Sequence, residues 1–208
     1  LNRGFVAMAR PYFEKALRLS PTYADAHNNL GVTLLRQGRP ADALPQFIAA
    51  LKDKPRFKDA QYNLGEAYLE LGRTGPALAA LEEDVKIDPD NPKAHNNLGI
   101  ALLDSGRAAE SIAEEQTALR LNPKMPEAHY NLGNALGRVG RIPEALAEYD
   151  ATLKLDSTFA KAYNNAGALL LQQGRNQDAR HRFEAALRIN PQYAEAKRNL
   201  VLVGGHPR

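Results

Sequence analysis

Six asparagines recur along the chain at intervals of 34 residues, and they are Asn29, Asn63, Asn97, Asn131, Asn165 and Asn199. A primary amide has one donor end and one acceptor end, so it can pair with both the N–H and the C=O of a peptide bond without reading a side chain. Asparagine in the middle of a helix costs about 0.5 kcal/mol relative to alanine, so some interaction must offset each one. The pattern therefore indicates sequence-tolerant binding of a peptide main chain.

Three histidines, His27, His95 and His129, share one position of the same repeat and could be read as metal ligands. Ligands of one metal lie about 2 Å from it, whereas equivalent positions on neighbouring helices are separated by about 8–10 Å or more. We therefore expect these histidines to pack between helices, and we expect neither a metal site nor a cofactor.

No other group of residues has the spacing of a catalytic site. The sequence contains no cysteine, which excludes disulfides, thiolate catalysis and sulfur-ligated metals. It also contains no phosphate-binding loop, nucleophile elbow, HExxH motif or dinucleotide fingerprint. The sequence predicts a protein that is not an enzyme.

The elements that carry the asparagines follow the same period. Glycine recurs in frame at Gly4, Gly38, Gly72, Gly106, Gly140 and Gly174. Apolar residues at three- and four-residue spacing on both sides of the glycine predict two amphipathic helices in each unit. In residues 24–57, for example, Leu30 and Leu34 line the first helix, Phe47 lines the second, and Pro55 ends it. The fold class is therefore all-α.

This period divides the chain into seven segments. Residues 1–23 contain the second helix of a truncated repeat, and residues 194–208 form a terminal capping helix and a tail. The full repeats are 24–57, 58–91, 92–125, 126–159 and 160–193. Because an uncapped stack of repeats exposes apolar surface, we expect at least one further helix before Leu1 in the natural protein.

The recurrent Leu-Gly, Ala, Phe or Tyr, Ala and Pro at these offsets resemble the tetratricopeptide repeat family over essentially the whole chain. The resemblance implies a right-handed superhelical solenoid of antiparallel helix pairs. Leu81 and Glu115 replace the usual aromatic residue, and Pro11 and Pro45 fall inside predicted helices. We expect local irregularity at these four positions and no change of fold.

The resemblance also implies that the first helix of each repeat lines a concave, peptide-binding groove. A ladder of asparagines similar to this one lines the tetratricopeptide region of O-linked N-acetylglucosamine transferase. The candidate peptide-binding residues are the six recurrent asparagines together with Asn28, Tyr62, Asn96, Tyr130, Asn164, Val32, Ile100 and Asn134. Duplicated repeats could also copy an asparagine that has no use, and this alternative stays open.

Some members of the family bind a C-terminal carboxylate with Lys and Arg side chains beside asparagine. In this chain the positions of the required lysine hold Asn or Tyr, and the positions of the required arginine hold Asn. Lys93 and Lys161 are isolated cations on this face. We therefore do not expect recognition of chaperone tails.

Charge and hydropathy narrow the choice of partners. The 27 basic and 24 acidic residues are mixed along the chain and give a net charge of +3, without the basic face that nucleic acid requires. No apolar run approaches the roughly 20 residues of a membrane span. We expect a protein or peptide partner. We favour the cytoplasm, and a targeting or anchor segment before Leu1 stays open.

Three functions are consistent with these observations. The first is a non-catalytic scaffold that binds an extended peptide or partner segment in the groove, and this is the function we predict. The second is the substrate-recruiting region of a larger enzyme, such as a glycosyltransferase. The third is a structural scaffold in which exposed ends of the solenoid join copies into a homo-oligomer.

Overall fold

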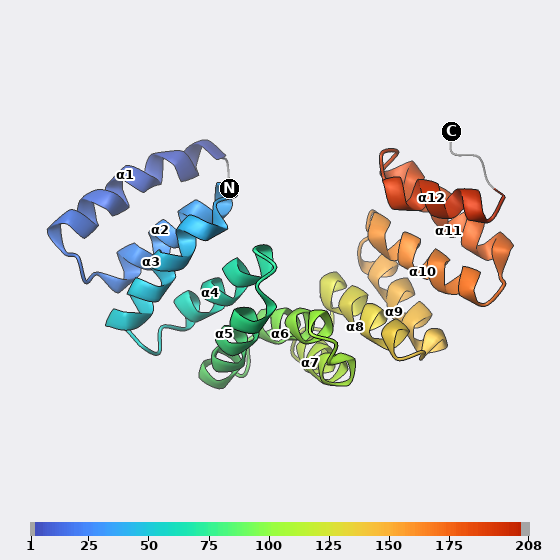
Figure 1. Ribbon diagram of the computed structural model, residues 1–208, viewed down its shortest axis with the longest axis horizontal. Coiled ribbons are helices and arrows are strands. Elements are labelled where there is room, and N and C mark those ends of the chain that lie inside the picture. The colour runs from blue at the N-terminus through green and yellow to red at the C-terminus, as the bar shows by residue number, and fades with distance from the viewer. Residues whose placement is uncertain (1–2, 205–208) are drawn as a thin grey trace. The chain divides into compact units, whose positions relative to one another are not determined.

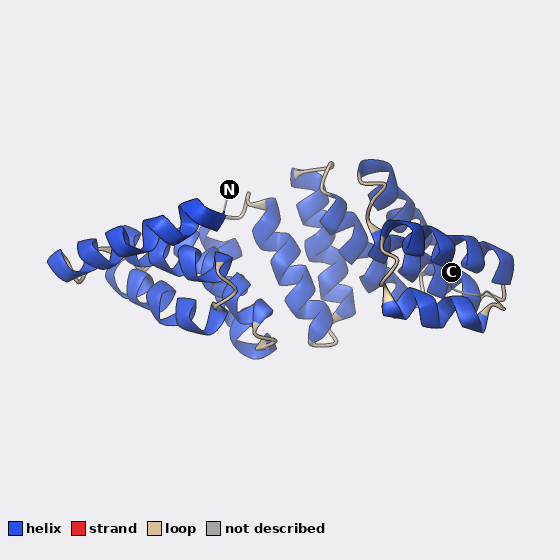
Figure 2. Ribbon diagram, turned by 90° about the horizontal axis from the view of Figure 1, so that it is seen from above, coloured by secondary structure: helices blue, strands red, loops and turns tan. Residues whose placement is uncertain are grey.

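The computed structural model describes residues 3–204, with side chains from residue 9 onward, and every regular element in this range is an α-helix (Figures 1 and 2). The prediction of an all-α fold is confirmed. The chain divides into two compact units, Leu1–Gly106 and Arg107–Arg208. None of the helices in the described range is long and apolar enough to cross a membrane.

Within the described residues 3–204, each unit contains six helices that follow one another in the chain. The first unit comprises α1 (Arg3–Leu19), α2 (Ala24–Arg36), α3 (Pro40–Asp53), α4 (Lys58–Glu70), α5 (Thr74–Ile87) and α6 (Pro92–Asp104). The second unit comprises α7 (Ala108–Leu121), α8 (Pro126–Arg138), α9 (Ile142–Leu155), α10 (Ala160–Gln172), α11 (Asn176–Ile189) and α12 (Ala194–Leu202). Consecutive helices within a unit pack against each other.

A glycine in the left-handed region ends the first helix of each pair. Gly38 has a φ of 71°, its N–H donates to the carbonyl of Leu35 at 2.8 Å, and the N–H of Arg39 donates to the carbonyl of Leu34 at 3.0 Å. These two bonds form the Schellman motif that closes a helix C-terminus. The recurrent glycine is thus fixed by the turn, because residues with a Cβ seldom adopt positive φ.

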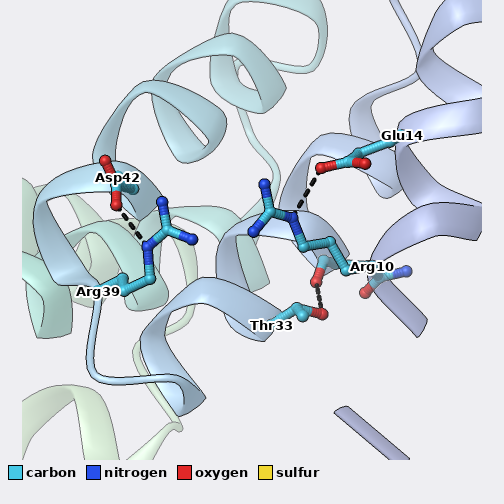
Figure 3. Close-up of polar contacts among 6 residues, drawn as sticks. Arg10, Glu14, Thr33, Arg39 and Asp42 are labelled. Atoms are coloured by element: carbon cyan, nitrogen blue, oxygen red, sulfur yellow. Dashed lines mark hydrogen bonds and ion pairs between the residues drawn. The ribbon is translucent and has the colours of Figure 1, made fainter. Parts of the chain in front are cut away.

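The arginine after this glycine pairs with an acidic residue three positions later, in the first turn of the second helix. Figure 3 shows the pair formed by Arg39 Nε and Asp42 Oδ2 at 2.7 Å, near a similar pair within α1, between Arg10 and Glu14. The same arrangement joins Arg107 to Glu110, Arg141 to Glu144 and Arg175 to Asp178. These pairs are exposed, so each contributes little to the stability of the fold.

The two helices of a pair approach closely at a second glycine. A Cβ placed on Gly31 would lie 2.5 Å from Cε1 of Phe47, and a Cβ on Gly167 would lie 2.6 Å from Cε1 of Phe183. Both rings are fully buried. In the α4–α5 pair Leu81 takes the place of the ring against Gly65 and is also fully buried, so this departure from the repeat pattern is accommodated.

The prolines inside helices do not interrupt them. Pro11 lies within α1 and Pro45 within α3, and both helices continue past their proline. Both prolines are exposed, so the ring faces solvent and does not disturb the packed side of the helix. Glu115, by contrast, is a fully buried carboxyl, and burial raises its pKa well above the ordinary value.

Candidate functional site

The candidate asparagines lie on helices that are neighbours in space as well as in repeat order. In the first unit α4 contacts both α2 and α6, and in the second unit α10 contacts both α8 and α12. Asn29, Asn63 and Asn97 therefore belong to one set of adjacent first helices, and the second unit holds the other three. Each set forms a candidate face of its own.

Asparagine side chains link these neighbouring helices directly. In each link a recurrent asparagine bonds to the residue 35 positions earlier. That residue directly precedes the recurrent asparagine of the previous repeat. The links are Asn63 Nδ2 to Asn28 Oδ1 at 2.9 Å, Asn165 Nδ2 to the Tyr130 hydroxyl at 3.0 Å, and Asn199 Nδ2 to Asn164 Oδ1 at 3.0 Å. Some of the recurrent asparagine amides are therefore already hydrogen-bonded within the protein.

Exposure separates the candidate residues into two groups. Asn28 and Asn96 are each 6% exposed and Asn164 is 0% exposed, so these three serve the interior of the helix layer. Asn29 is exposed. The half-buried candidates are Asn63, Asn97, Asn131, Asn165, Asn199, Tyr62, Tyr130, Val32, Ile100 and Asn134. The exposed and half-buried residues present most of the atoms that a partner can contact.

In the second unit the candidates form one polar network. Asn134 Oδ1 accepts from Asn165 Nδ2 at 2.8 Å and from the Tyr149 hydroxyl at 2.8 Å. The Tyr130 ring packs on Phe159 with 4.9 Å between ring centroids. Burial raises the pKa of both Tyr130 and Tyr149, so both hydroxyls stay protonated at neutral pH. This network fixes the side chains that line the face.

In the first unit Tyr62 occupies the corresponding place. Burial, followed by the nearby Glu66 carboxylate, raises the pKa of Tyr62 to about 12, while a hydrogen bond with Asn97 lowers it. Tyr62 lies on α4 and Asn97 on the neighbouring helix α6. Tyr62 is therefore a neutral, half-buried hydroxyl on the candidate face.

A pocket of about 350 Å³ opens on this face of the first unit. Of the residues proposed from the sequence, Asn28, Val32, Tyr62 and Asn63 line it, and Lys93 contributes a cation. Further lining comes from residues that sequence reasoning missed, namely Arg36, Lys58, Asp59, Asp88 and Asn91. Most of these stand at helix ends or in the loop before α6, where helical periodicity carries no signal.

The pocket is polar and mixed in charge. Lys58 Nζ lies 3.4 Å from Asp88 Oδ2, and both side chains remain partly exposed. Glu66, in the next turn of α4, is half-buried; burial and Glu70 raise its pKa, while Lys93 and Arg36 lower it. Such a site offers donors, acceptors and both signs of charge to a partner, which suits a peptide better than an apolar ligand.

A buried carboxyl lies close to the acidic side of this pocket. Asp84 on α5 is 0% exposed, and within the described residues neither of its oxygens has a hydrogen-bond partner. Burial, then the charges of Asp88 and Asp59, raise its pKa to about 7, and His95 lowers it. The equivalent residues of the other second helices are Ala50, Ala118, Thr152 and Ala186. An acid at an alanine position is the sequence signal that could have identified it.

The three histidines act as hydrogen-bonding residues between elements. His129 Nδ1 lies 2.6 Å from Glu148 Oε2 and its Nε2 lies 3.3 Å from the carbonyl of Pro123. His27 makes the same two contacts with Gln46 and Pro21, and His95 Nε2 lies 2.9 Å from the carbonyl of Pro89. No group of potential ligands in the described part of the chain has metal-binding geometry.

Family models and solved structures agree on the nature of the repeat. One model described as a tetratricopeptide repeat matches residues 33–92, 76–126, 96–158, 130–194 and 164–204, and another with the same description matches residues 12–44. None of the curated proteins compared with the sequence matches it.

Several solved structures share the fold. YrrB, described as a TPR protein with an unusual peptide-binding site, is 24% identical with a TM-score of 0.70, over 89% of this chain and 96% of its own. PilF of Pseudomonas aeruginosa is 23% identical with a TM-score of 0.80, over 96% and 91%. The Cut9–Hcn1 hetero-tetramer gives 20% identity and a TM-score of 0.84, over 95% of this chain but 39% of that one. At these identities the likeness shows the fold alone.

Proposed function

The chain belongs to the tetratricopeptide repeat family of protein-interaction scaffolds, and from this premise we propose that its first unit binds an extended segment of a partner protein. The binding site in this proposal is the pocket between α2, α4 and α6. The protein acts without catalysis, by holding the partner.

The observation that supports the proposal is that side chains able to contact a peptide main chain line this pocket from three helices. Asn63 and Tyr62 face it from α4, Val32 supplies an apolar contact from α2, and Lys93 supplies a cation from α6. Neighbouring helices stand about 10 Å apart and an extended chain rises about 3.3 Å per residue. Successive first helices therefore meet roughly every third residue of a bound segment.

The links between helices define how the asparagines contribute. Asn28 and Asn164 accept hydrogen bonds from the next first helix, and Asn96 is also buried, so the atoms offered to a partner belong mainly to the exposed and half-buried candidates. In the first unit these are Asn29, Asn63, Asn97, Tyr62, Val32 and Ile100. We extend the proposal to Asn131, Asn165, Asn199, Tyr130 and Asn134 as the equivalent face of the second unit. The likeness to YrrB, whose description includes a peptide-binding site, supports this reading.

A library of random peptides displayed on phage tests the proposal. We expect the protein to capture peptides of many unrelated sequences. The variant Val32→Trp, which fills the pocket without removing an asparagine link, should weaken binding of these peptides about tenfold or more. Ile48→Trp is the matched control, because Ile48 lies on α3, outside the pocket, and is already 50% exposed.

Two outcomes oppose the proposal. If Val32→Trp and Ile48→Trp bind peptides equally well, the pocket is not the binding site. If no peptide is captured and the sedimentation coefficient rises with protein concentration, self-assembly explains the exposed surfaces better.

A further inference from the structure

The positive charge of the chain is concentrated at its C-terminal end. Residues 160–208 contain eight Lys or Arg and three Asp or Glu, a net charge of +5, whereas the whole chain has +3. Residues 1–159 therefore carry a net charge of −2. α11 supplies three of the eight basic residues, Arg180, Arg182 and Arg188, together with His181, and it also contains Asp178 and Glu184.

A second pocket, of about 320 Å³, lies beside these charges, between α9, α10 and α11. Leu146 and Leu170 give it an apolar lining. Arg175, His181 and Arg182 line it with basic side chains, and Asp150 and Asp178, which pair with the two arginines, complete the lining. Leu170 belongs to the hydrophobic core of this unit and Leu146 packs against that core. The pocket therefore combines an apolar wall with basic groups, and none of the proposed peptide-binding residues lines it.

Two of the basic residues are peculiar to this repeat. His181 and Arg182 stand where the earlier second helices have Pro45 and Gln46, Ala79 and Ala80, Ala113 and Glu114, or Ala147 and Glu148. Arg175, in contrast, belongs to the turn pair with Asp178 that recurs in most repeats. The specific chemistry of the pocket thus comes from His181 and Arg182.

The Arg182 guanidinium is held in place before any partner arrives. Its Nη2 donates to Asp150 Oδ1 on α9 at 2.8 Å, and its Cζ stands 6.0 Å from the centroid of the Tyr163 ring on α10. The side chain is 30% exposed, so part of its fork of five donors still faces the pocket. Fixing an arginine in advance lowers the entropy lost when it binds a carboxylate.

His181 is the accessible member of the pair. It is exposed and makes no hydrogen bond within the described residues. Together with Arg182 it gives two adjacent basic groups above an apolar wall, a combination that matches an acidic side chain beside an apolar one. Charge complementarity of this kind selects partners and orients them.

We propose that this pocket is a second docking site, which takes an acidic segment of a protein partner with at least one apolar side chain. The acidic walls formed by Asp150 and Asp178 interrupt the basic surface, so it lacks the continuous stripe of cations that a nucleic-acid backbone requires. The site is independent of the pocket in the first unit, and a partner can occupy either one alone.

Fluorescence anisotropy with a defined probe tests the site. The probe is a short fluorescein-labelled peptide of glutamates around one leucine, and its counterpart has glutamine in place of each glutamate. We expect the complete chain to bind the glutamate peptide and to bind the glutamine peptide at least about tenfold more weakly. Arg182→Gln and His181→Ala should each weaken binding of the glutamate peptide about tenfold.

Arg180→Gln is the matched control, because Arg180 lies on the same helix, pairs with Glu184 at 2.9 Å and does not line the pocket. Its binding should match that of the wild type, as should binding by Val32→Trp. If Arg180→Gln and Arg182→Gln lose the same affinity for the glutamate peptide, the attraction is a nonspecific effect of charge, and the proposed site is wrong. Tighter binding of a single-stranded oligonucleotide of the same charge would overturn the choice of a protein partner, and an unchanged affinity in His181→Ala would overturn the role of His181.

Discussion

Asn63 donates its side-chain amide to the side-chain oxygen of Asn28, a buried residue 35 positions earlier in the chain, at 2.9 Å. The same offset joins Asn199 to Asn164 and Asn165 to Tyr130. The recurrent asparagine therefore has a structural use, which offsets its poor helix propensity. This use is compatible with peptide binding, because one amide has several hydrogen-bonding positions.

Removal of this link should destabilise the first unit. Asn63→Ala leaves the buried Oδ1 of Asn28 without its donor, so we expect the free energy of unfolding to fall by about 1–3 kcal/mol. Asn29→Ala is the matched control: Asn29 is exposed, and its backbone carbonyl, which accepts from the Thr33 hydroxyl (Figure 3), is unaffected by the change. Asn29→Ala should leave the stability unchanged or raise it by about 0.5 kcal/mol.

Urea unfolding followed by circular dichroism measures both variants. In the double variant Asn28→Ala/Asn63→Ala no orphaned oxygen remains, so the combined loss should be smaller than the sum of the two single losses. Strict additivity would show that the observed hydrogen bond does not contribute to stability.

The close approach of α2 and α3 should make Gly31 intolerant of a side chain. In Gly31→Ala the new Cβ would lie 2.5 Å from the fully buried Phe47 ring, so the ring or the helix must move, at a cost of about 1–3 kcal/mol. Gly75→Ala places a Cβ near the start of α5 with nothing within 4 Å. This control should cost less than Gly31→Ala, because its Cβ meets no packed side chain and only the ring of the following Pro76 restricts it. A melting temperature that is equal in the two variants would contradict the packing.

Asp84 should make the stability of the first unit depend on pH. Its pKa rises from 3.8 to about 7 on folding, so the folded state binds the proton more tightly. The wild-type free energy of unfolding should therefore fall as pH increases from about 4 to about 7 and stay low above it, with a total change of at most about 4 kcal/mol. Asp84→Ala removes this dependence. The gain in its free energy of unfolding over that of the wild type should therefore be small at pH 4 and largest at pH 8.

Asp90→Ala gives the control for that experiment. Asp90 lies exposed in the loop before α6 and carries the same charge, so its replacement should leave the pH dependence of unfolding as in the wild type. A gain from Asp84→Ala that is the same at pH 4 and pH 8 would mean that Asp84 keeps an ordinary pKa in the folded protein.

The helix pairs could be predicted from sequence because each depends on local rules that recur every 34 residues. Gly38 shows this well: the turn requires a residue that tolerates a φ of 71°, and glycine is the residue that does. Phe47 was likewise predicted to line the second helix, and its ring is fully buried. The terminal helix, expected within residues 194–208, is observed over Ala194–Leu202.

The candidate site was less predictable, because it depends on how neighbouring repeats stack. Asn28 and Asn29 are adjacent in α2 and point about 100° apart. Which of the two is buried depends on where α4 packs beside α2: Asn28 is buried and Asn29 is exposed. Lys58 and Asp88 stand 30 residues apart and meet at 3.4 Å through the packing of α4 against α5. The residues next to Lys58 and Asp88 in the sequence form no pattern that would have predicted the pocket.

The most direct test of peptide binding by the first unit is a titration of the isotopically labelled complete chain with a captured peptide, followed by NMR of the backbone amides. We predict that the amides of Val32, Tyr62 and Lys93, which line the pocket on α2, α4 and α6, shift most. Shifts confined to the second helices, around Ile48 on α3 and Glu83 on α5, would contradict the proposed binding site.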